Sequence, residues 1–370
     1  MENPFRYGIV VDDPYFVGRQ EEMRDFFGWL STGQSLILYS PRRYGKTSLI
    51  LKVLQNLKKE GYHTIYIDFF KVQSRVRFVE LYYKAIIGSM TSWEKAIRQI
   101  SSLVKSIRPV FSVDQYGSPS VTVQSDTASD LPDISEVFDL PQKLAEDKPW
   151  VVVFDEFQEV AGLNGEAFEK ELRASLIHHN KVSYVFMGSQ KHMLLNMFTL
   201  RNRAFYQFGK IVELKKIPED IVLNYLTQHF RESGFEPPAK LCREIIAISN
   251  NIPHYVQYLA SAVWEAGIES NFTTTDQILN KAVDKIVTNQ NDYFSTLYEN
   301  LTSYQKKVLK AIHADPMNIL SSDYSRRFRL SSASSTQRAA ERLVKDGIIE
   351  KVGDIWQFTD PFFRIWLNGM

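Results

Sequence analysis

Several features that are common in proteins are scarce in this chain of 370 residues, and each absence excludes a class of protein. The single cysteine, Cys242, excludes an internal disulfide framework and a zinc site built from several cysteines. No apolar run approaches the length that crosses a bilayer, and the first residues lack a basic stretch followed by an apolar one. The net charge of +1 excludes a histone-like coat of basic residues. We therefore expect a cytoplasmic globular protein with no membrane partner.

The first 215 residues alternate between strand-like and helix-like stretches. Short apolar runs predict strands at 35–39, 63–70, 150–154, 182–187 and 211–214. Helical patterns fall between these runs, at 45–60, at 77–107 and in the second half of 130–147. Strands separated by helices predict an α/β fold in which helices cover both faces of a parallel sheet. Alternating residues around Tyr116-Gly117 predict a β-hairpin inserted at 108–125.

The pattern changes after residue 215. Residues 218–290 show helical periodicity with little strand signal, and prolines divide them into about four predicted helices. From about residue 296, helices at 302–314, 321–328 and 334–345 precede short strands at 348–352 and 355–358. Three helices followed by a small hairpin are the outline of a winged helix.

The stretch from Ser40 to Ser48, Ser-Pro-Arg-Arg-Tyr-Gly-Lys-Thr-Ser, follows the first predicted strand and begins a helix. Successive backbone N–H groups and a helix N-terminus attract the oxygens of a polyphosphate. Gly45 permits close backbone approach, Lys46 can reach the outer phosphates, and Thr47 can offer its hydroxyl to Mg²⁺. The pattern of such P-loops begins with glycine, whereas Ser40 stands here. A Gly-Lys-Thr that begins a helix by chance is the alternative.

Arg42 and Arg43 lie inside this loop, where most P-loops carry neutral residues. They could contact phosphate, a neighbouring subunit or an acidic segment, or they could be solvated. The candidate phosphate-binding loop comprises Ser40, Pro41, Arg42, Arg43, Tyr44, Gly45, Lys46, Thr47 and Ser48.

A second apolar run, 150–154, ends in Asp155 and Glu156 and resembles a Walker B element. The first acid would hold Mg²⁺, directly or through water. The second would orient and polarise the attacking water, because phosphoryl transfer depends mainly on positioning and charge stabilisation. Two solvated acids at a strand end are the alternative. The order of the two motifs on predicted strands favours a nucleotide-binding P-loop NTPase, and Glu156 favours hydrolysis over binding alone.

Five segments spread over nearly the whole chain resemble the archaeal-type ATPases of the STAND group, which are relatives of the AAA+ proteins. They are Phe-Val-Gly-Arg-Gln-Glu-Glu at 16–22, Pro-Arg-Arg-Tyr-Gly-Lys-Thr-Ser at 41–48, Phe-Asp-Glu-Phe at 154–157, Met-Gly-Ser at 187–189 and Phe-Thr-Asp-Pro-Phe-Phe-Arg-Ile-Trp at 358–366. The resemblance implies an ASCE-type sheet, in which one further strand lies between the P-loop strand and the Walker B strand. It also implies a helical lid, a C-terminal winged helix, and ATP or ADP rather than a guanine nucleotide.

The resemblance assigns the adenine side of the nucleotide site to the four residues before the first helix. They are Phe16, Val17, Gly18 and Arg19, with Val17 on the base. A hydrophobic staple ahead of a helix that begins near Gln20 is the alternative, and the two roles are compatible.

Two residues near later strands match positions that sense the γ-phosphate in the family. Ser189 matches the sensor-1 position, although its hydroxyl could instead cap the helix of residues 190–198; Gln190 is the fallback. Arg203 matches an arginine that complements γ-phosphate charge. Arg201 competes for that role, and a surface salt bridge is the alternative.

Asn-Ile-Pro at 251–253 resembles the family's Gly-x-Pro motif at the start of a lid helix, with Asn251 where glycine is more usual. By this resemblance Pro253 could pack on the base, although proline is also ordinary in the first turn of a helix. His254 is an outside candidate for a phosphate contact.

Basic residues gather before and on the third helix of the predicted winged helix. They are Arg326, Arg327, Arg329, Arg338, Arg342 and Lys345. This helix enters the DNA major groove in DNA-binding winged helices, so DNA is one candidate partner. Docking to a protein, or to another part of the chain, is the alternative. The aromatic ending is expected to form core; it comprises Phe358, Phe362, Phe363 and Trp366.

Together these features predict a Mg²⁺-dependent ATPase with a P-loop core at 1–215, a helical lid at 216–295 and a winged helix at 296–370. The expected catalytic residues are Lys46, Glu156, Ser189 and Arg203. The expected metal ligands are Thr47 and Asp155. We expect a slow switch, monomeric or oligomeric with nucleotide, that couples its nucleotide state to a protein or DNA partner. The alternatives are a DNA-binding regulator with a structural nucleotide site and an oligomeric AAA-like remodeller.

Overall fold

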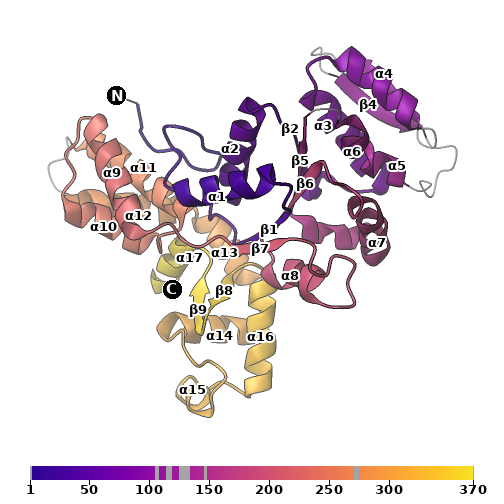
Figure 1. Ribbon diagram of the computed structural model, residues 1–370. Helices are drawn as coiled ribbons and strands as arrows, with labels where there is room; N and C mark the ends of the chain where they lie inside the picture. Colours follow the sequence, from indigo (N-terminus) through magenta and orange to yellow (C-terminus); the bar gives the residue numbers. More distant parts are fainter. Residues whose placement is uncertain are drawn as a thin grey trace. The chain divides into compact units, whose positions relative to one another are not determined.

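The chain forms two compact units in a computed structural model that describes residues 2–104, 108–113, 119–124, 134–145, 148–270 and 275–369. The core unit is Asp12–Lys216, and the helical unit combines Met1–Val11 with Ile217–Met370. Figure 1 shows the elements of both units. None of the helices in the described ranges has the length and apolar content that crossing a bilayer requires.

A five-stranded parallel sheet forms the centre of the core unit. Its strands are β1 (Leu36–Tyr39), β2 (His63–Asp68), β5 (Trp150–Asp155), β6 (Val182–Gly188) and β7 (Lys210–Glu213). They lie in the order β2-β5-β6-β1-β7, and every neighbouring pair is parallel. β6 therefore lies between β1 and β5, which confirms the expected extra strand between the P-loop strand and the Walker B strand.

The central strands are apolar throughout because both faces of the sheet are covered. Successive side chains of a strand point to opposite faces. Accordingly Ile37 and Val152 belong to one buried cluster, whereas Leu38 and Val153 belong to a second. The covering helices are α1 (Gln20–Ser31), α2 (Lys46–Lys59), α3 (Arg75–Ser89), α4 (Trp93–Leu103), α5 (Ser135–Phe138), α6 (Leu140–Leu144), α7 (Gly165–Leu176) and α8 (Lys191–Thr199). Short 3₁₀ helices follow two strands, η1 (Phe69–Lys71) and η2 (Phe157–Gly162).

The inserted hairpin is confirmed. β3 (Arg108–Val113) pairs with β4 (Pro119–Gln124) in antiparallel register, and the pair lies beside α3 and α4 (Figure 1). Val121 is buried in the same cluster as α3, which holds the hairpin against the core unit. The turn predicted around Tyr116-Gly117 lies outside the described residues.

The helical unit contains the predicted four helices followed by the winged helix. The four are α9 (Glu219–Glu232), α10 (Ala239–Ile248), α11 (Pro253–Glu269) and α12 (Thr275–Asn289). After α13 (Asn291–Glu299), the winged helix comprises α14 (Ser303–Ala314), α15 (Ser322–Arg327), α16 (Ala333–Lys345), β8 (Ile349–Val352) and β9 (Ile355–Phe358), with α17 (Pro361–Trp366) and η3 (Leu367–Gly369) at the end. β8 and β9 form the antiparallel wing.

The N-terminal segment packs with the helical unit. Phe5 is buried among the rings of Tyr225, His229 and Phe230. The predicted core domain of 1–215 therefore differs from the compact core unit by its first eleven residues. Burying the apolar surface of the Phe5 ring lowers the free energy of the folded chain, which favours this packing over exposure to solvent.

The aromatic ending forms core, as expected. Phe362 and Phe363 are fully or almost fully buried, and Trp366 donates its indole N–H to Asn291 Oδ1 at 3.0 Å. The rings pack on one another and on Phe294 of α13, so they join α17 to the rest of the helical unit.

Candidate functional site

The carboxyl ends of β1, β5 and β6 meet at one edge of the sheet and bring the main predicted residues together. Tyr39 of β1 lies opposite Gly188 of β6, and Phe154 of β5 lies opposite Phe186. The loop that begins at Ser40, the two acids that follow Phe154, and Ser189 therefore share that edge. This is the edge at which open α/β sheets bind ligands.

The loop after β1 has the backbone that a phosphate-binding turn requires. Arg43 and Gly45 have φ angles of 72° and 86°, and Gly45 is the residue from which α2 begins. The first N–H groups of an α-helix have no partner within the helix, so the start of α2 offers hydrogen-bond donors to an anion. Ser40 is buried without a positive φ, so this position does not need glycine. Arg42 and Arg43 are exposed, and the Arg42 guanidinium lies 5.8 Å from the centre of the Phe70 ring.

Lys46 is a buried cation, and main-chain oxygens are the hydrogen-bond partners of its ammonium among the described residues. Its side chain is almost fully enclosed, and Nζ donates to the carbonyls of Ser40 at 3.0 Å and Pro41 at 3.3 Å. Burial lowers the pKa of Lys46, while the charges of Asp155 and Glu156 act in the opposite direction. No carboxylate in the described part of the chain lies within salt-bridge distance of Nζ. A buried ammonium in this state favours an anionic ligand.

Asp155 is buried and accepts hydrogen bonds on both oxygens. Oδ2 accepts from Thr47 Oγ1 at 3.2 Å and from the hydroxyl of Tyr66, and Oδ1 accepts from the backbone N–H of Glu156 at 2.9 Å. Burial raises the pKa of Asp155, and the hydrogen bond from Tyr66 opposes that rise. Tyr66 was not among the predicted site residues. It comes from β2, whose place beside β5 brings it to Asp155, and no local signal in the sequence indicates that pairing.

Glu156 lies in the left-handed region with φ of 49°, and its side chain turns toward β6. Its Oε2 accepts from the N–H of Ser189 at 3.0 Å, from the hydroxyl of Ser189 at 2.8 Å and from Nε2 of Gln158 at 2.5 Å. The helix-capping alternative for Ser189 is wrong, because α8 begins after Gln190 without a side-chain cap. Gln158 was also missed; its position two residues after Glu156 was the only available signal.

Arg19 joins the segment before α1 to the loop and to the end of the core unit. Its buried guanidinium donates to the carbonyls of Tyr44 at 3.3 Å and Lys215 at 2.6 Å and pairs with Glu22 at 2.7 Å. Burial lowers the pKa of Arg19. Phe16 packs against the buried cluster that includes α1 and α2, and α1 begins at Gln20 as expected. Arg19 and the adjoining stretch from Phe16 thus lie next to the loop.

Arg203 is engaged by acids of α7. Its guanidinium pairs with Glu169, which is almost fully buried, and lies 3.6 Å from Glu166. Burial raises the pKa of Glu169, and Arg203 opposes that rise. Among the described residues, no contact joins Arg203 to the loop or to Glu156. The competing Arg201 is exposed.

Pro253 is the first residue of α11 in the helical unit, as its resemblance to a lid motif predicts. Asn251 has φ of 51°, and its side-chain amide donates to the carbonyl of Ile217 at 2.8 Å. Asparagine tolerates this left-handed conformation better than most residues, which explains why it can stand where glycine is usual. The ring of His254 packs against Tyr7 and Tyr255.

Several basic residues of the winged helix have acidic partners. Arg326 pairs with Asp323, and Arg342 pairs with Asp346 at 2.9 Å. Arg327 pairs with an acid as well, Asp315. The remaining members of the cluster, Arg329, Arg338 and Lys345, have no salt bridge within the described residues.

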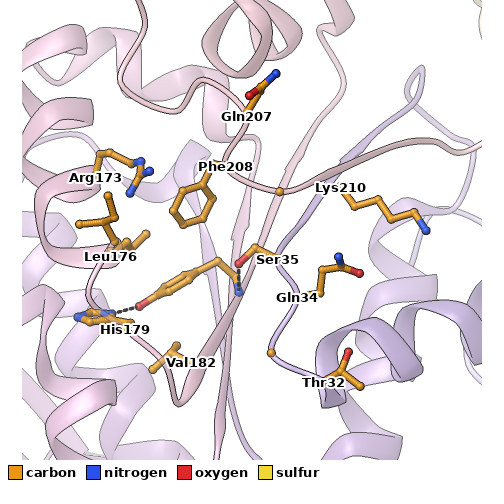
Figure 2. A pocket seen from close by; sticks show the side chains of 14 residues that line it. Thr32, Gln34, Ser35, Arg173, Leu176, His179, Val182, Gln207, Phe208 and Lys210 are labelled. Atoms are coloured by element: carbon orange, nitrogen blue, oxygen red, sulfur yellow. Dashed lines mark hydrogen bonds between the residues drawn. The ribbon is translucent and has the colours of Figure 1, made fainter.

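A cavity of about 780 Å³ lies at the opposite edge of the sheet, between the α1–β1 turn, the end of α7 and the beginnings of β6 and β7 (Figure 2). His179 Nδ1 and the hydroxyl of Tyr184 are 2.5 Å apart at one end of it, and Arg173 stacks on Phe208. None of the residues predicted for nucleotide or metal lines this cavity. It is therefore separate from the candidate site.

Comparison with known proteins agrees with the geometry. A family model described as an ATPase domain predominantly from Archaea matches residues 16–259, and a model described as a probable winged helix domain matches residues 292–369. No curated protein matches the chain.

Solved structures resemble the chain along its whole length. The Walker-type ATPase of Pyrococcus abyssi has a TM-score of 0.69 at 17% identity, with 99% of each chain covered. The ORC2 protein of Aeropyrum pernix, in its ADPNP–ADP complexes, has a TM-score of 0.57 at 14% identity, covering 99% of this chain and 98% of its own. The ORC1 protein of Aeropyrum pernix, in complex with DNA, has a TM-score of 0.51 at 14% identity, covering 100% and 98%. At these identities the likeness concerns the fold, which is that of a P-loop NTPase followed by a winged helix.

Proposed function

The chain belongs to the family of ATPase domains found predominantly in Archaea, and from this membership we propose that it binds ATP with Mg²⁺ and hydrolyses the γ-phosphate. We also propose that the chain belongs to the STAND group, which its sequence resembles. One observation carries it. A buried lysine, a hydroxyl–carboxylate pair and a second carboxylate lie together at the sheet edge beside the loop before α2.

The loop residues fit a triphosphate. In the part of the chain that the structure describes, Lys46 is a buried cation bound by carbonyl oxygens alone, so phosphate oxygens would supply the anionic partner that it lacks. Backbone N–H groups in the first turn of α2 would add donors. Phe16 and Val17 would lie on the adenine side, and Pro253 would contact the base. Arg42 and Arg43 are exposed, and we propose that they contact the outer phosphates or a partner.

The pair of Thr47 and Asp155 fits Mg²⁺. Both offer hard oxygen ligands, and their oxygens already lie 3.2 Å apart. No group of three or more His, Cys, Asp or Glu side chains in the described residues could form a metal cage. Mg²⁺ suits such a site because it usually keeps several water ligands and is held by one or two protein ligands together with phosphate oxygens. When bound, Mg²⁺ neutralises charge on the phosphate oxygens.

Glu156 is the residue that we propose to activate the attacking water. Its carboxylate would orient a water molecule and accept its proton, and Ser189 would connect that carboxylate to the end of β6. Arg203 is proposed to complement charge on the γ-phosphate, which requires it to leave Glu169. Lys46 would stabilise the same charge from the loop.

The proposed division of the chain is a P-loop core at 1–215, a lid at 216–295 and a winged helix at 296–370. We propose that the chain is a slow switch and that the lid and the winged helix transmit its nucleotide state to a partner. Its partner is a protein or DNA, and Arg329, Arg338 and Lys345, which have no salt bridge among the described residues, would supply positive charge for DNA. A gel-shift series at several salt concentrations separates these partners, because phosphate contacts weaken steeply with salt. Light scattering with ATP tests for an oligomer.

Phosphate release from the wild type and from the Glu156→Gln variant tests the proposal. Glu156→Gln keeps the shape of the side chain, so ATP should bind normally in calorimetry while turnover falls by about a hundredfold or more. Lys46→Ala should lose ATP binding. Glu213→Gln is the matched control: Glu213 ends β7 at the same sheet edge, and its carboxylate is 3.1 Å from Lys191. Equal, negligible rates in wild type and Glu156→Gln, with ATP bound, would instead support the regulator with a structural nucleotide site.

A further inference from the structure

Gln158 is a buried amide whose donor faces Glu156. The residue belongs to η2 and is 1% exposed. Nε2 lies 2.5 Å from Glu156 Oε2, with a longer contact of 3.5 Å to Glu159 Oε1. The amide oxygen, Oε1, is buried and has no hydrogen-bond partner among the described residues. Burying an unsatisfied acceptor is unfavourable, and an apolar side chain of the same length would avoid that cost.

The amide of Gln158 occupies space that a side chain at position 188 would fill, and Gly188 has none. A Cβ atom at position 188 would stand 2.1 Å from Gln158 Oε1 and 3.3 Å from Gln158 Cδ. Leu194 of α8 closes the same space, with Cδ2 at 3.3 Å. The φ of Gly188 is not positive, so backbone conformation does not demand glycine there. The missing side chain matters because it lets Gln158 lie flat against the end of β6.

The donors around Glu156 converge on one of its two oxygens. Oε2 accepts from Gln158 Nε2 and from both the N–H and the hydroxyl of Ser189. Within the described part of the chain, Oε1 of Glu156 has no hydrogen-bond partner. Three donors on one oxygen fix the plane of the carboxylate and leave the lone pairs of the other oxygen available.

We propose that Gln158 is a positioning residue for Glu156, and that Gly188 is required because it admits the Gln158 amide. The pair holds Oε2 against the end of β6 so that Oε1 faces the water that is to be activated. This inference rests on the proposed hydrolytic role of Glu156. Gln158 acts through Glu156 and touches no reacting atom itself.

Two substitutions remove the amide contact in different ways. Gln158→Met keeps the length of the side chain without its donor. Gly188→Ala keeps Gln158 but displaces its amide, and the fold should tolerate this because the displaced atoms are the end of a flexible side chain. Each variant should lower kcat by about tenfold to a hundredfold, with KM and the calorimetric affinity for ATP within about twofold of wild type. Gly162→Ala is the control, since a Cβ there, in the same η2 turn, meets nothing within 4 Å.

The double variant tests the connection between the two residues. If Gly188→Ala acts by displacing the Gln158 amide, adding it to Gln158→Met should change kcat no further. Additive losses would overturn the proposed role of Gly188. A kcat of Gln158→Met within about twofold of wild type would overturn the role of Gln158.

Hydrogen exchange in the nucleotide-free protein decides the inference without any turnover. The Ser189 N–H donates to Glu156 Oε2, so its exchange reports whether that oxygen is held in place. We expect exchange at Ser189 to be about tenfold faster or more in both variants and unchanged in Gly162→Ala. Unchanged exchange at Ser189 in Gln158→Met refutes the positioning role. A wild type that turns over no ATP would refute the proposed function alone, since the exchange result does not depend on it.

Discussion

The pair formed by Arg203 and Glu169 allows a sharp test, because one partner is almost fully buried. The side chain of Glu169 is 2% exposed, whereas that of Arg203 is 23% exposed. The second carboxylate oxygen, Oε2 of Glu169, has no hydrogen-bond partner among the described residues. Replacing Arg203 by methionine keeps most of the apolar contact and leaves the carboxylate of Glu169 without its cation. We expect a large loss of stability in the core unit.

The magnitude follows from the proton that Glu169 must then take up. Its ordinary pKa is 4.5, so holding it neutral at about pH 7 costs about 1.36 kcal/mol for each of about 2.5 pH units, or about 3.4 kcal/mol. This lies at the low end of the range of about 3–5 kcal/mol for breaking a buried ion pair. The folded variant binds a proton that the unfolded chain has released. Its stability relative to wild type should therefore rise as the pH falls, leaving a cost of about 1.4 kcal/mol at about pH 5.5.

Amide hydrogen exchange in β5 and β6 measures this cost, because these strands report the free energy of opening of the core unit alone. Arg201→Met is the matched control: Arg201 is exposed, and the variant should stay within about 0.5 kcal/mol of wild type. A loss below about 1 kcal/mol at about pH 7, or a loss that does not change with pH, would refute the reasoning.

A double variant, Arg203→Met with Glu169→Leu, separates stability from catalysis. Removing both charges of a buried pair should restore most of the lost stability. If Arg203 also complements γ-phosphate charge, this folded variant should hydrolyse ATP about a hundredfold more slowly than wild type. Wild-type turnover in the double variant would exclude Arg203 from the catalytic residues and leave it a purely structural role.

Three further predictions concern other contacts. Burial lowers the pKa of His179 from its ordinary 6.5, so below about pH 6.5 the unfolded chain binds more protons than the folded chain. The free energy of unfolding should therefore decrease as the pH falls below about 6.5. In urea titrations at several pH values, this decrease should be smaller in His179→Gln. Tyr66→Phe removes a hydroxyl donor from Asp155 and should raise the pKa of that carboxyl further; Mg²⁺ titrations of ATP binding should show affinity about tenfold weaker. Trp366→Phe loses the hydrogen bond to Asn291 and should destabilise α17 by about 1 kcal/mol in amide exchange.

Much of the fold could be predicted because its signals are local. The runs that became β1 and β5 are apolar at consecutive positions, as expected of strands covered on both faces. The helices and wing of the C-terminal part follow from periodicity and from turn residues such as Gly353, which has φ of 61°. The order of the strands is different, since local sequence does not specify neighbours. The resemblance to a family predicted one part of that order, the strand between the P-loop strand and the Walker B strand.

The residues that were missed act across strands. Tyr66 reaches Asp155 because β2 pairs with β5, and Gln158 reaches its place because Gly188 ends the neighbouring β6. Each is an ordinary residue in its own segment, and only the tertiary pairing gives it a role. The packing of Phe5 on α9 is also a tertiary contact without a local signal, although it involves a helix and not a strand.

The two departures from the family's glycines show that a motif is better judged by backbone angles than by its letters. Glycine is favoured over other residues only where φ is positive or where a Cβ would collide. Ser40 stands at the first position of the loop without a positive φ, and its hydroxyl donates to the carbonyl of Pro41 at 3.0 Å, so the turn forms with a side chain present. Asn251 does have a positive φ, but it belongs to the small set of residues that adopt this conformation readily, and its amide is bonded to Ile217. Gly188 has no positive φ, and yet a Cβ there would collide with the amide of Gln158 and displace it. A search that requires glycine at the family's positions would reject Ser40 and Asn251 and would give no weight to Gly188. The geometry shows the opposite: Ser40 and Asn251 fit their backbone conformations, whereas a Cβ at position 188 would collide with Gln158.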